Sequence, residues 1–171
     1  MQKIIVVSGL PGSGKSMIAE GLSRELSLPI FSIDPIEAAM WRSGIDRNAT
    51  GIAAYEIAAT LADEHIKLGH SVVIDAVSPV EAARDMWRKV ATDNRGQLVI
   101  IEVICSDEQV HKQRIEKRVR NIPGMPEVTW ERVQQRKREF EPWQDEHLTL
   151  DSIEKPEALV SKAVTYAQKV S

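Results

Sequence analysis

The residues from Gly9 to Ser16 have the types and the spacing needed to bind a chain of phosphate groups. They read Gly-Leu-Pro-Gly-Ser-Gly-Lys-Ser, which is the spacing G-x-x-x-x-G-K-S of a phosphate-binding loop (P-loop). The glycines permit a tight turn that points successive N–H groups inward, and a helix behind the loop adds its positive amino end. Lys15 would reach the β- and γ-phosphates of a nucleotide, and the Ser16 hydroxyl would hold Mg²⁺. The alternative is a chance match in a glycine turn.

Two aspartates stand directly after short apolar runs. Asp34 follows residues 30–33 and Asp75 follows residues 71–74. If both runs are strands of one parallel sheet, these carboxylates lie at the edge where ligands bind. Asp34 is then a candidate general base that takes a proton from, or orients, an acceptor hydroxyl. Asp75 is a candidate Mg²⁺ ligand through water, or an acceptor-binding group. The plainer interpretations are a helix N-cap for Asp34, ahead of Pro35, and a solvated loop carboxylate for Asp75.

Basic residues concentrate between about residues 112 and 138. The positive residues there are Lys112, Arg114, Lys117, Arg118, Arg120, Arg132, Arg136, Lys137 and Arg138. They would lie on two helices flanking a loop with prolines and a glycine, residues 121–127. Arg114 and Arg118 are four residues apart, so they would share one helix face. Guanidinium groups bind phosphate well, so this hairpin is a candidate lid over a nucleotide. A solvated basic helix pair and an RNA-contacting patch are the alternatives, and later arginines could replace Arg114 and Arg118.

Composition indicates an ordinary globular chain with one domain. The chain has 171 residues, 43% apolar and 27% charged, and its net charge is −3. This charge argues against a general affinity for nucleic acid. The single cysteine, Cys105, excludes an internal disulfide and is expected to be a buried, inert thiol. No apolar run approaches the length of a membrane span, and the start resembles no signal peptide, so we expect a cytoplasmic protein.

Short apolar runs alternate with helical patterns along the chain. We expect strands at about 3–8, 30–33, 71–74, 98–104 and 147–150. We expect helices at about 14–27, 34–43, 51–68, 79–94, 107–120 and 129–140, and from Pro156 onward. Ser78 and Ser106 would each open a helix as part of a capping box. This order predicts an α/β, three-layer P-loop NTPase fold over residues 1–171. It would have a five-stranded parallel sheet, helices on both faces and a short helical lid.

These motifs together resemble the small P-loop kinases. The resemblance is carried by G-L-P-G-S-G-K-S, by the aspartate that closes the second strand, by V-V-I-D and by Q-R-I-E-K-R after the fourth strand. The stretch T-W-E-R-V-Q-Q-R-K-R-E-F-E-P-W looks like the helix that follows the lid in the AAA-like, predicted-kinase branch. That branch is related to polynucleotide 5′-kinase, gluconate kinase, adenylylsulfate kinase and chloramphenicol phosphotransferase. The resemblance covers nearly the whole chain.

The resemblance implies a set of site residues. ATP and Mg²⁺ would be bound by Gly12, Ser13, Gly14, Lys15, Ser16 and Met17. Lys15, Asp34 and Arg118 would be catalytic, with Asp34 as the base and Arg118 at the phosphates. Arg114 would pack on the adenine, and the loop from Asp151 to Pro156 would contact the same base.

The acceptor side departs from the family pattern. Polynucleotide kinases and related toxins often have Asp-x-x-Arg after the second strand, whereas this chain has Asp34-Pro35-Ile36-Glu37. Arg42 lies further along and could replace that arginine, so Asp34, Arg42 and Asp75 are candidate acceptor-binding residues. The expected activity is transfer of the γ-phosphoryl group from ATP to a hydroxyl of a small polar acceptor. A polynucleotide 5′-hydroxyl kinase and a non-catalytic ATP-binding module are the alternatives. The sequence leaves open the acceptor, the choice of ATP or GTP, and the oligomeric state.

Overall fold

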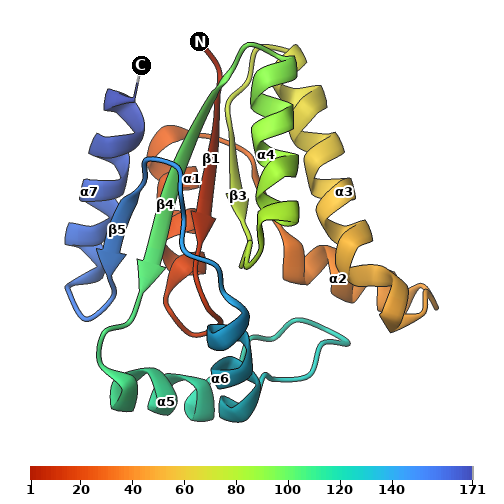
Figure 1. The fold of residues 1–171 in the computed structure, drawn as a ribbon, viewed down its shortest axis with the longest axis vertical. Coiled ribbons are helices and arrows are strands. Elements are labelled where there is room, and N and C mark those ends of the chain that lie inside the picture. The colour runs from red at the N-terminus through yellow and green to blue at the C-terminus, as the bar shows by residue number, and fades with distance from the viewer. Residues whose placement is uncertain (171) are drawn as a thin grey trace.

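The computed structural model describes residues 1–170, in which five parallel strands form one sheet with helices on both faces (Figure 1). The strands are β1 (Lys3–Ser8), β2 (Ile30–Ser32), β3 (Val72–Asp75), β4 (Gln97–Ile104) and β5 (Leu148–Asp151). The helices are α1 (Lys15–Leu26), α2 (Ile33–Arg42), α3 (Arg47–Lys67), α4 (Glu81–Asp93), α5 (Glu108–Lys117), α6 (Trp130–Glu139) and α7 (Pro156–Lys169). The predicted three-layer P-loop NTPase fold is confirmed.

The sheet has the order β2-β3-β1-β4-β5, so β1 lies at its centre. The apolar run of β1 is buried on both faces, as a central parallel strand requires. Ile4 and Val6 pack toward the core shared with α2, α3 and α4. Ile5 and Val7 point the other way, toward the core shared with α1 and α7. Because successive side chains of β1 point to opposite faces of the sheet, this one strand packs against both helical layers.

The expected helix starts were wrong at three places. Ser78 has a φ of 46°, and its Oγ accepts a hydrogen bond from Trp87, so α4 begins later, at Glu81. At α5 the cap is Asp107 rather than Ser106, because the Asp107 carboxylate accepts from the N–H of Val110. Helix α3 begins at Arg47 rather than near residue 51, since Asp46 caps it. At α3 and α5 an aspartate side chain accepts from an exposed N–H group of the first turn, whereas α4 begins after Val80 without a capping side chain.

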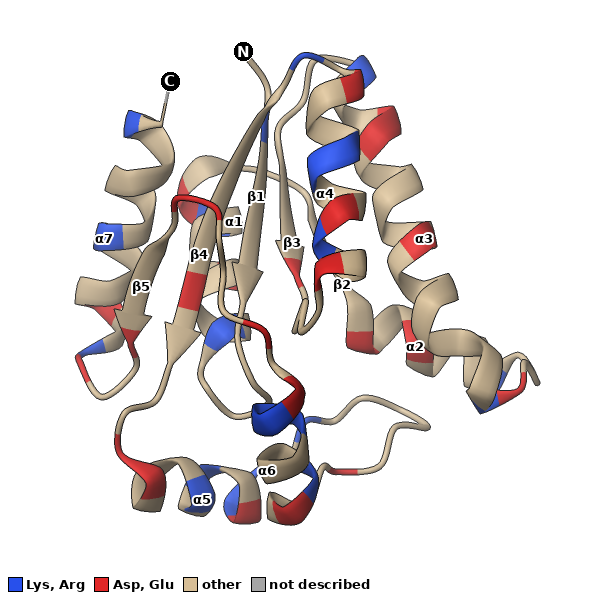
Figure 2. Cartoon of the chain, in the orientation of Figure 1, with Lys and Arg blue, Asp and Glu red and all other residues tan. Residues whose placement is uncertain are grey.

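The carboxyl ends of the strands point toward the hairpin formed by α5 and α6 (Figure 1). The P-loop follows β1 at this edge, and the long loop between α5 and α6 extends beneath α2 in this view. Acidic and basic residues are interspersed along α5 and α6 (Figure 2). Every helix within residues 1–170 is too short or too polar to span a lipid bilayer.

Candidate active site

The P-loop takes the conformation that its glycines permit. Gly12 and Gly14 have φ values of +78° and +99°, in the region that side chains rarely adopt, and α1 begins directly after them at Lys15. A Cβ on Gly12 would lie 2.6 Å from Cδ1 of Ile115 in α5. The N-terminus of α1 therefore lies directly behind a loop that packs closely against α5. A glycine-rich loop at a helix N-terminus is the arrangement that binds phosphate.

Lys15 and Asp75 meet at the inner wall of the site. The Lys15 ammonium lies 3.8 Å from Oδ1 of Asp75, and the two residues are only 5% and 9% exposed. Oδ1 of Asp75 is buried and accepts no hydrogen bond from residues 1–170. Ser16 stands in the first turn of α1, beside Lys15. A hydroxyl and a buried carboxylate oxygen that accepts no hydrogen bond are oxygen ligands of the kind that Mg²⁺ prefers, so Ser16 and Asp75 fit the metal.

A cleft of about 270 Å³ joins the P-loop to α5. Its lining residues are Gly12, Gly14, Lys15, Ser16, Met17, Arg114, Lys117 and Arg118. The structure thus brings Gly12, Gly14, Lys15, Ser16 and Met17 together with Arg114 and Arg118, whereas the predicted Ser13 is buried and lines a different cleft. The two arginines do not share a helix face, contrary to expectation, because α5 ends at Lys117 and Arg118 is extended (φ −69°, ψ 133°).

Arg118 is a half-buried cation at the mouth of this cleft. Burial lowers the pKa of Arg118, and the neighbouring Arg120 lowers it further, while Asp34, Glu127 and Asp75 act in the opposite direction. Its guanidinium makes no ion pair or hydrogen bond with the part of the chain that the structure describes. A partly desolvated, unpaired guanidinium beside a P-loop is suited to meeting an anion.

Arg114 is fixed against the loop that follows β5. Its guanidinium donates to Oγ of Ser152 at 2.6 Å and to the Ser152 carbonyl at 2.8 Å. It also lies 3.6 Å from Sγ of Cys105, which is partly exposed rather than buried as expected. The thiol lies at the end of β4, where the strand leaves the core, so the apolar run that precedes it did not indicate its exposure.

A second cleft, of about 500 Å³, lies between α1 and α7 and contains Pro156. Met17 lines both clefts, so they adjoin at the second residue after Lys15. Met17 and Pro156 therefore line one cleft, which adjoins the cleft at the P-loop.

Asp34 is not a helix cap. Helix α2 begins at Ile33 with Ser32 as its N-cap residue, so Asp34 lies inside the first turn. Its Oδ2 accepts a hydrogen bond of 2.7 Å from Nη1 of Arg120, in the loop after α5. The capping interpretation is therefore wrong, and the arginine that reaches Asp34 is Arg120. No local signal distinguishes Arg120, because the contact spans 86 positions of the chain.

Arg42 of α2 and Tyr55 of α3 each bind a neighbouring loop. Nη1 of Arg42 donates to the carbonyl of Pro123 at 2.5 Å, so this guanidinium holds the loop between α5 and α6. The Tyr55 hydroxyl accepts from the N–H of Ser78 at 3.0 Å. Burial raises the pKa of Tyr55 to about 12, with a smaller contribution from the charge of Asp34. The spacing of apolar residues in α3 gives no sign of the bond between Tyr55 and Ser78, which lie 23 positions apart in the chain.

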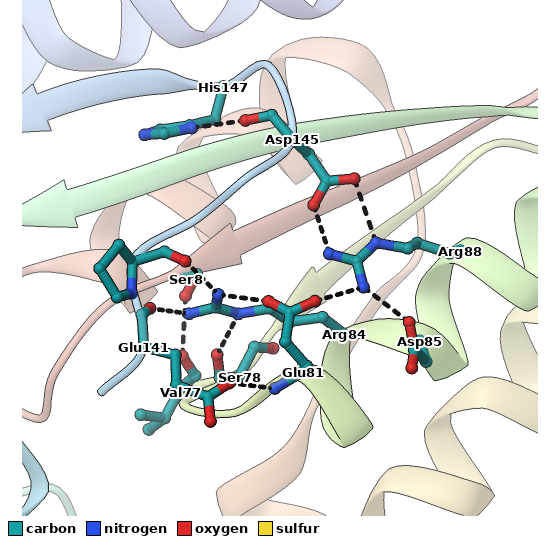
Figure 3. Close-up of polar contacts among 11 residues, drawn as sticks. Ser8, Val77, Ser78, Glu81, Arg84, Asp85, Arg88, Glu141, Asp145 and His147 are labelled. Carbon is teal, nitrogen blue, oxygen red and sulfur yellow. Dashed lines mark hydrogen bonds and ion pairs between the residues drawn. The ribbon is translucent and has the colours of Figure 1, made fainter. Parts of the chain in front are cut away.

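A buried arginine ties the end of α6 to the loop that follows Asp75 (Figure 3). Arg84 is fully buried and donates to the carbonyls of Ser78, Glu141 and Pro142 and to the Glu81 carboxylate. Its guanidinium stacks 4.0 Å from the ring centre of Trp143. Next to it, Arg88 pairs with Asp145 at 2.5 Å. This network fixes the segment leaving α6 relative to the β3–α4 loop.

Comparison with known proteins places the chain in a family. A family model described as an AAA domain matches residues 4–143. The chain belongs to this family. A UPF0200 protein from Hyperthermus butylicus is 29% identical over 145 residues, which cover 78% of this chain and 73% of that protein. The match agrees with the resemblance to the AAA-like branch of the small P-loop kinases.

Solved structures share the fold across the whole chain. A sugar kinase from Janibacter sp. superposes with a TM-score of 0.74 at 22% identity, covering 99% of this chain and 96% of that one. The adenylylsulfate (APS) kinase CysC of Mycobacterium tuberculosis, in complex with AMPPNP and APS, gives 0.72 at 17% identity, with 98% of each chain covered. At these identities the likeness shows the fold, which is that of small P-loop kinases.

Proposed function

We propose that this chain is an ATP- and Mg²⁺-dependent phosphotransferase that moves the γ-phosphoryl group to a hydroxyl of a small polar acceptor. The observation that carries the proposal is that Asp34, Lys15 and Asp75 lie at the carboxyl ends of three neighbouring strands, while Arg118 lines the P-loop cleft and Arg120 pairs with Asp34. A kinase needs cations around the transferred group and a carboxylate beside the acceptor, and this edge of the sheet provides both.

The nucleotide side would be formed by the P-loop and α5. Residues Gly12, Ser13, Gly14, Lys15 and Ser16 would hold the triphosphate, with Met17, Arg114 and Pro156 toward the base. Ser16 and Asp75 would hold Mg²⁺, which supplies charge neutralisation for the phosphates when bound. Lys15 and Arg118 would stabilise negative charge on the phosphoryl oxygens as transfer proceeds. The hairpin over about residues 112–138 would act as the lid of this single domain and exclude water.

The acceptor side would be formed by α2 and the loop of the hairpin. Asp34 would orient the acceptor hydroxyl and take its proton, and Arg42 and Asp75 would contribute to the same wall. Residues Trp41 to Tyr55 bring mixed polarity to this wall, which fits a small polar metabolite. Relatives with this fold include a sugar kinase and an APS kinase bound to its acceptor, which supports a hydroxyl-bearing small molecule.

The test is transfer from Mg-ATP to pooled metabolites, followed by ³¹P NMR. Lys15→Ala is expected to abolish transfer. Asp34→Asn is expected to keep ATP affinity and to slow transfer by about two to four orders of magnitude. Asp85→Asn removes a carboxylate that is 69% exposed on α4, so it serves as the matched control and should leave the rate unchanged. Unchanged turnover in Asp34→Asn would remove the assignment of the base.

Two outcomes would replace the proposal by another function. Phosphorylation of oligonucleotide 5′ ends, with affinity that falls steeply as salt is added, would indicate a polynucleotide kinase. Tight ATP binding with neither a phosphorylated product nor hydrolysis would indicate a non-catalytic binding module.

A further inference from the structure

The loop between α5 and α6 is built around the side chain of Arg120. Nη1 donates to Asp34 at 2.7 Å, Nε donates to Glu127 at 3.2 Å, and Nη2 donates to the carbonyl of Pro126 at 2.8 Å. The backbone N–H of Arg120 donates to the other Glu127 oxygen at 2.8 Å. Although it belongs to a loop, the Arg120 side chain is only 5% exposed. We call Asp34, Arg120 and Glu127 the Arg120 clamp.

The clamp engages one oxygen of Asp34 and leaves the other available. Oδ2 accepts the bond from Arg120, whereas Oδ1 accepts no hydrogen bond from residues 1–170. The Asp34 side chain is 32% exposed, so a small molecule can reach it. A charge-assisted bond to a planar guanidinium restricts the rotation of a carboxylate. With Oδ2 held, the position of Oδ1 is restricted as well.

We propose that Arg120 is the positioning residue that aligns Asp34 for the acceptor and couples this alignment to closure of the lid. The inference rests on the proposed function. Arg120 belongs to the lid loop and Asp34 belongs to α2, so the two meet only while the loop is docked. When the loop lifts, the carboxylate loses its partner and regains rotational freedom. Transfer, to an acceptor hydroxyl or to a single water molecule that takes its place, therefore proceeds with the lid closed, where bulk water is excluded.

A separate contact holds the same loop in place. The alignment of Asp34 can therefore be tested apart from the attachment of the loop. Arg42 holds the loop through the Pro123 carbonyl at 2.5 Å. A Cβ on Gly124 would lie 3.1 Å from Cγ of Arg42, so the loop also packs closely on this side chain. Loss of the Arg120 guanidinium leaves these contacts in place, although it also removes the bonds to Glu127 and Pro126 within the loop. Of the bonds made by this guanidinium, the one to Asp34 reaches outside the loop.

The experiment measures Mg-ATP hydrolysis, with water as the acceptor, and Mg-ATP affinity by calorimetry. Arg120→Met is expected to lower kcat by about 10- to 100-fold, the range of one charge-assisted hydrogen bond, with Kd for Mg-ATP changed by less than about threefold. Arg120→Lys should retain an intermediate rate. Arg95→Met is the matched control, since Arg95 is exposed in the turn before β4, at the opposite end of the strands, and its side chain bonds to no other residue within 1–170; its kcat should stay within about twofold.

Chemical rescue separates alignment of the base from loss of the loop structure. Guanidinium chloride at about 20 mM should restore part of the Arg120→Met rate and none of the Asp34→Asn rate, because the free cation can occupy the vacated position beside Asp34. Hydrogen exchange over residues 121–127 reports whether the loop stays docked. An unchanged kcat in Arg120→Met, or a loss that guanidinium does not restore, overturns the inference. A wild-type chain that neither binds nor hydrolyses Mg-ATP defeats the proposed function itself.

Discussion

Replacing Arg84 by methionine should destabilise the whole domain. Methionine fills the space of the arginine stem but leaves the carbonyls of Ser78, Glu141 and Pro142 without their donor. Each buried acceptor left unsatisfied costs about 1–3 kcal/mol, and loss of the stacking on Trp143 adds about 1 kcal/mol. Water that enters beside the partly exposed Glu81 recovers some of this. We therefore expect a loss of about 3–5 kcal/mol.

The loss can be measured by urea unfolding and by thermal denaturation. For a chain of this size, each kcal/mol lowers Tm by about 2–4 °C, so Tm should fall by about 10 °C. Arg24→Met is the control, because the Arg24 side chain is 72% exposed and its ion pair with Glu20 is 3.8 Å long. That variant should change stability by less than about 0.5 kcal/mol.

The same variant also tests the reasoning about the site. Since Arg84 connects the end of α6 to the loop after Asp75, Mg-ATP should raise the Tm of Arg84→Met less than it raises that of the wild type. A loss of stability below about 1 kcal/mol would refute the argument, because it would mean that the three carbonyls readily find other donors.

Three further predictions concern the P-loop and its surroundings. Gly12→Ala should abolish Mg-ATP binding measured by calorimetry, because φ is +78° and the new Cβ would lie 2.6 Å from Ile115; normal affinity would contradict this. Burial lowers the pKa of His111 below its ordinary value of 6.5, so unfolded chains bind its proton more tightly and stability should fall as pH drops below about 6.5. His111→Gln should flatten that slope in urea titrations at several pH values, and an unaltered slope would assign it to other groups. Tyr55→Phe should cost about 1–2 kcal/mol in the same assay, because the N–H of Ser78 loses its acceptor; an unchanged midpoint would mean that water replaces the hydroxyl.

The sequence by itself determined the sheet and the phosphate-binding loop. Continuous apolar runs separated by helical patterns can bury themselves only as parallel strands covered on both faces, which fixed the fold class. The P-loop could also be predicted from the sequence, because its glycines, Lys15 and Ser16 lie within eight consecutive residues. The positions of Asp34 and Asp75 at one edge followed from the same rule, since parallel strands end on one side.

Only the tertiary structure decided which side chains meet across that edge. Arg120 rather than Arg118 contacts Asp34, and Arg42 binds the loop of the hairpin, because the loop folds back over α2 from far along the chain. Arg84 reaches Pro142 over 58 positions in the same way. Such pairs depend on the path that a loop takes and on which hydrogen-bond donors are buried away from water. The spacing of residues along the sequence predicts neither. The periodicity of the sequence therefore predicted where this edge of the sheet lies, whereas tertiary packing determined which side chains meet along it.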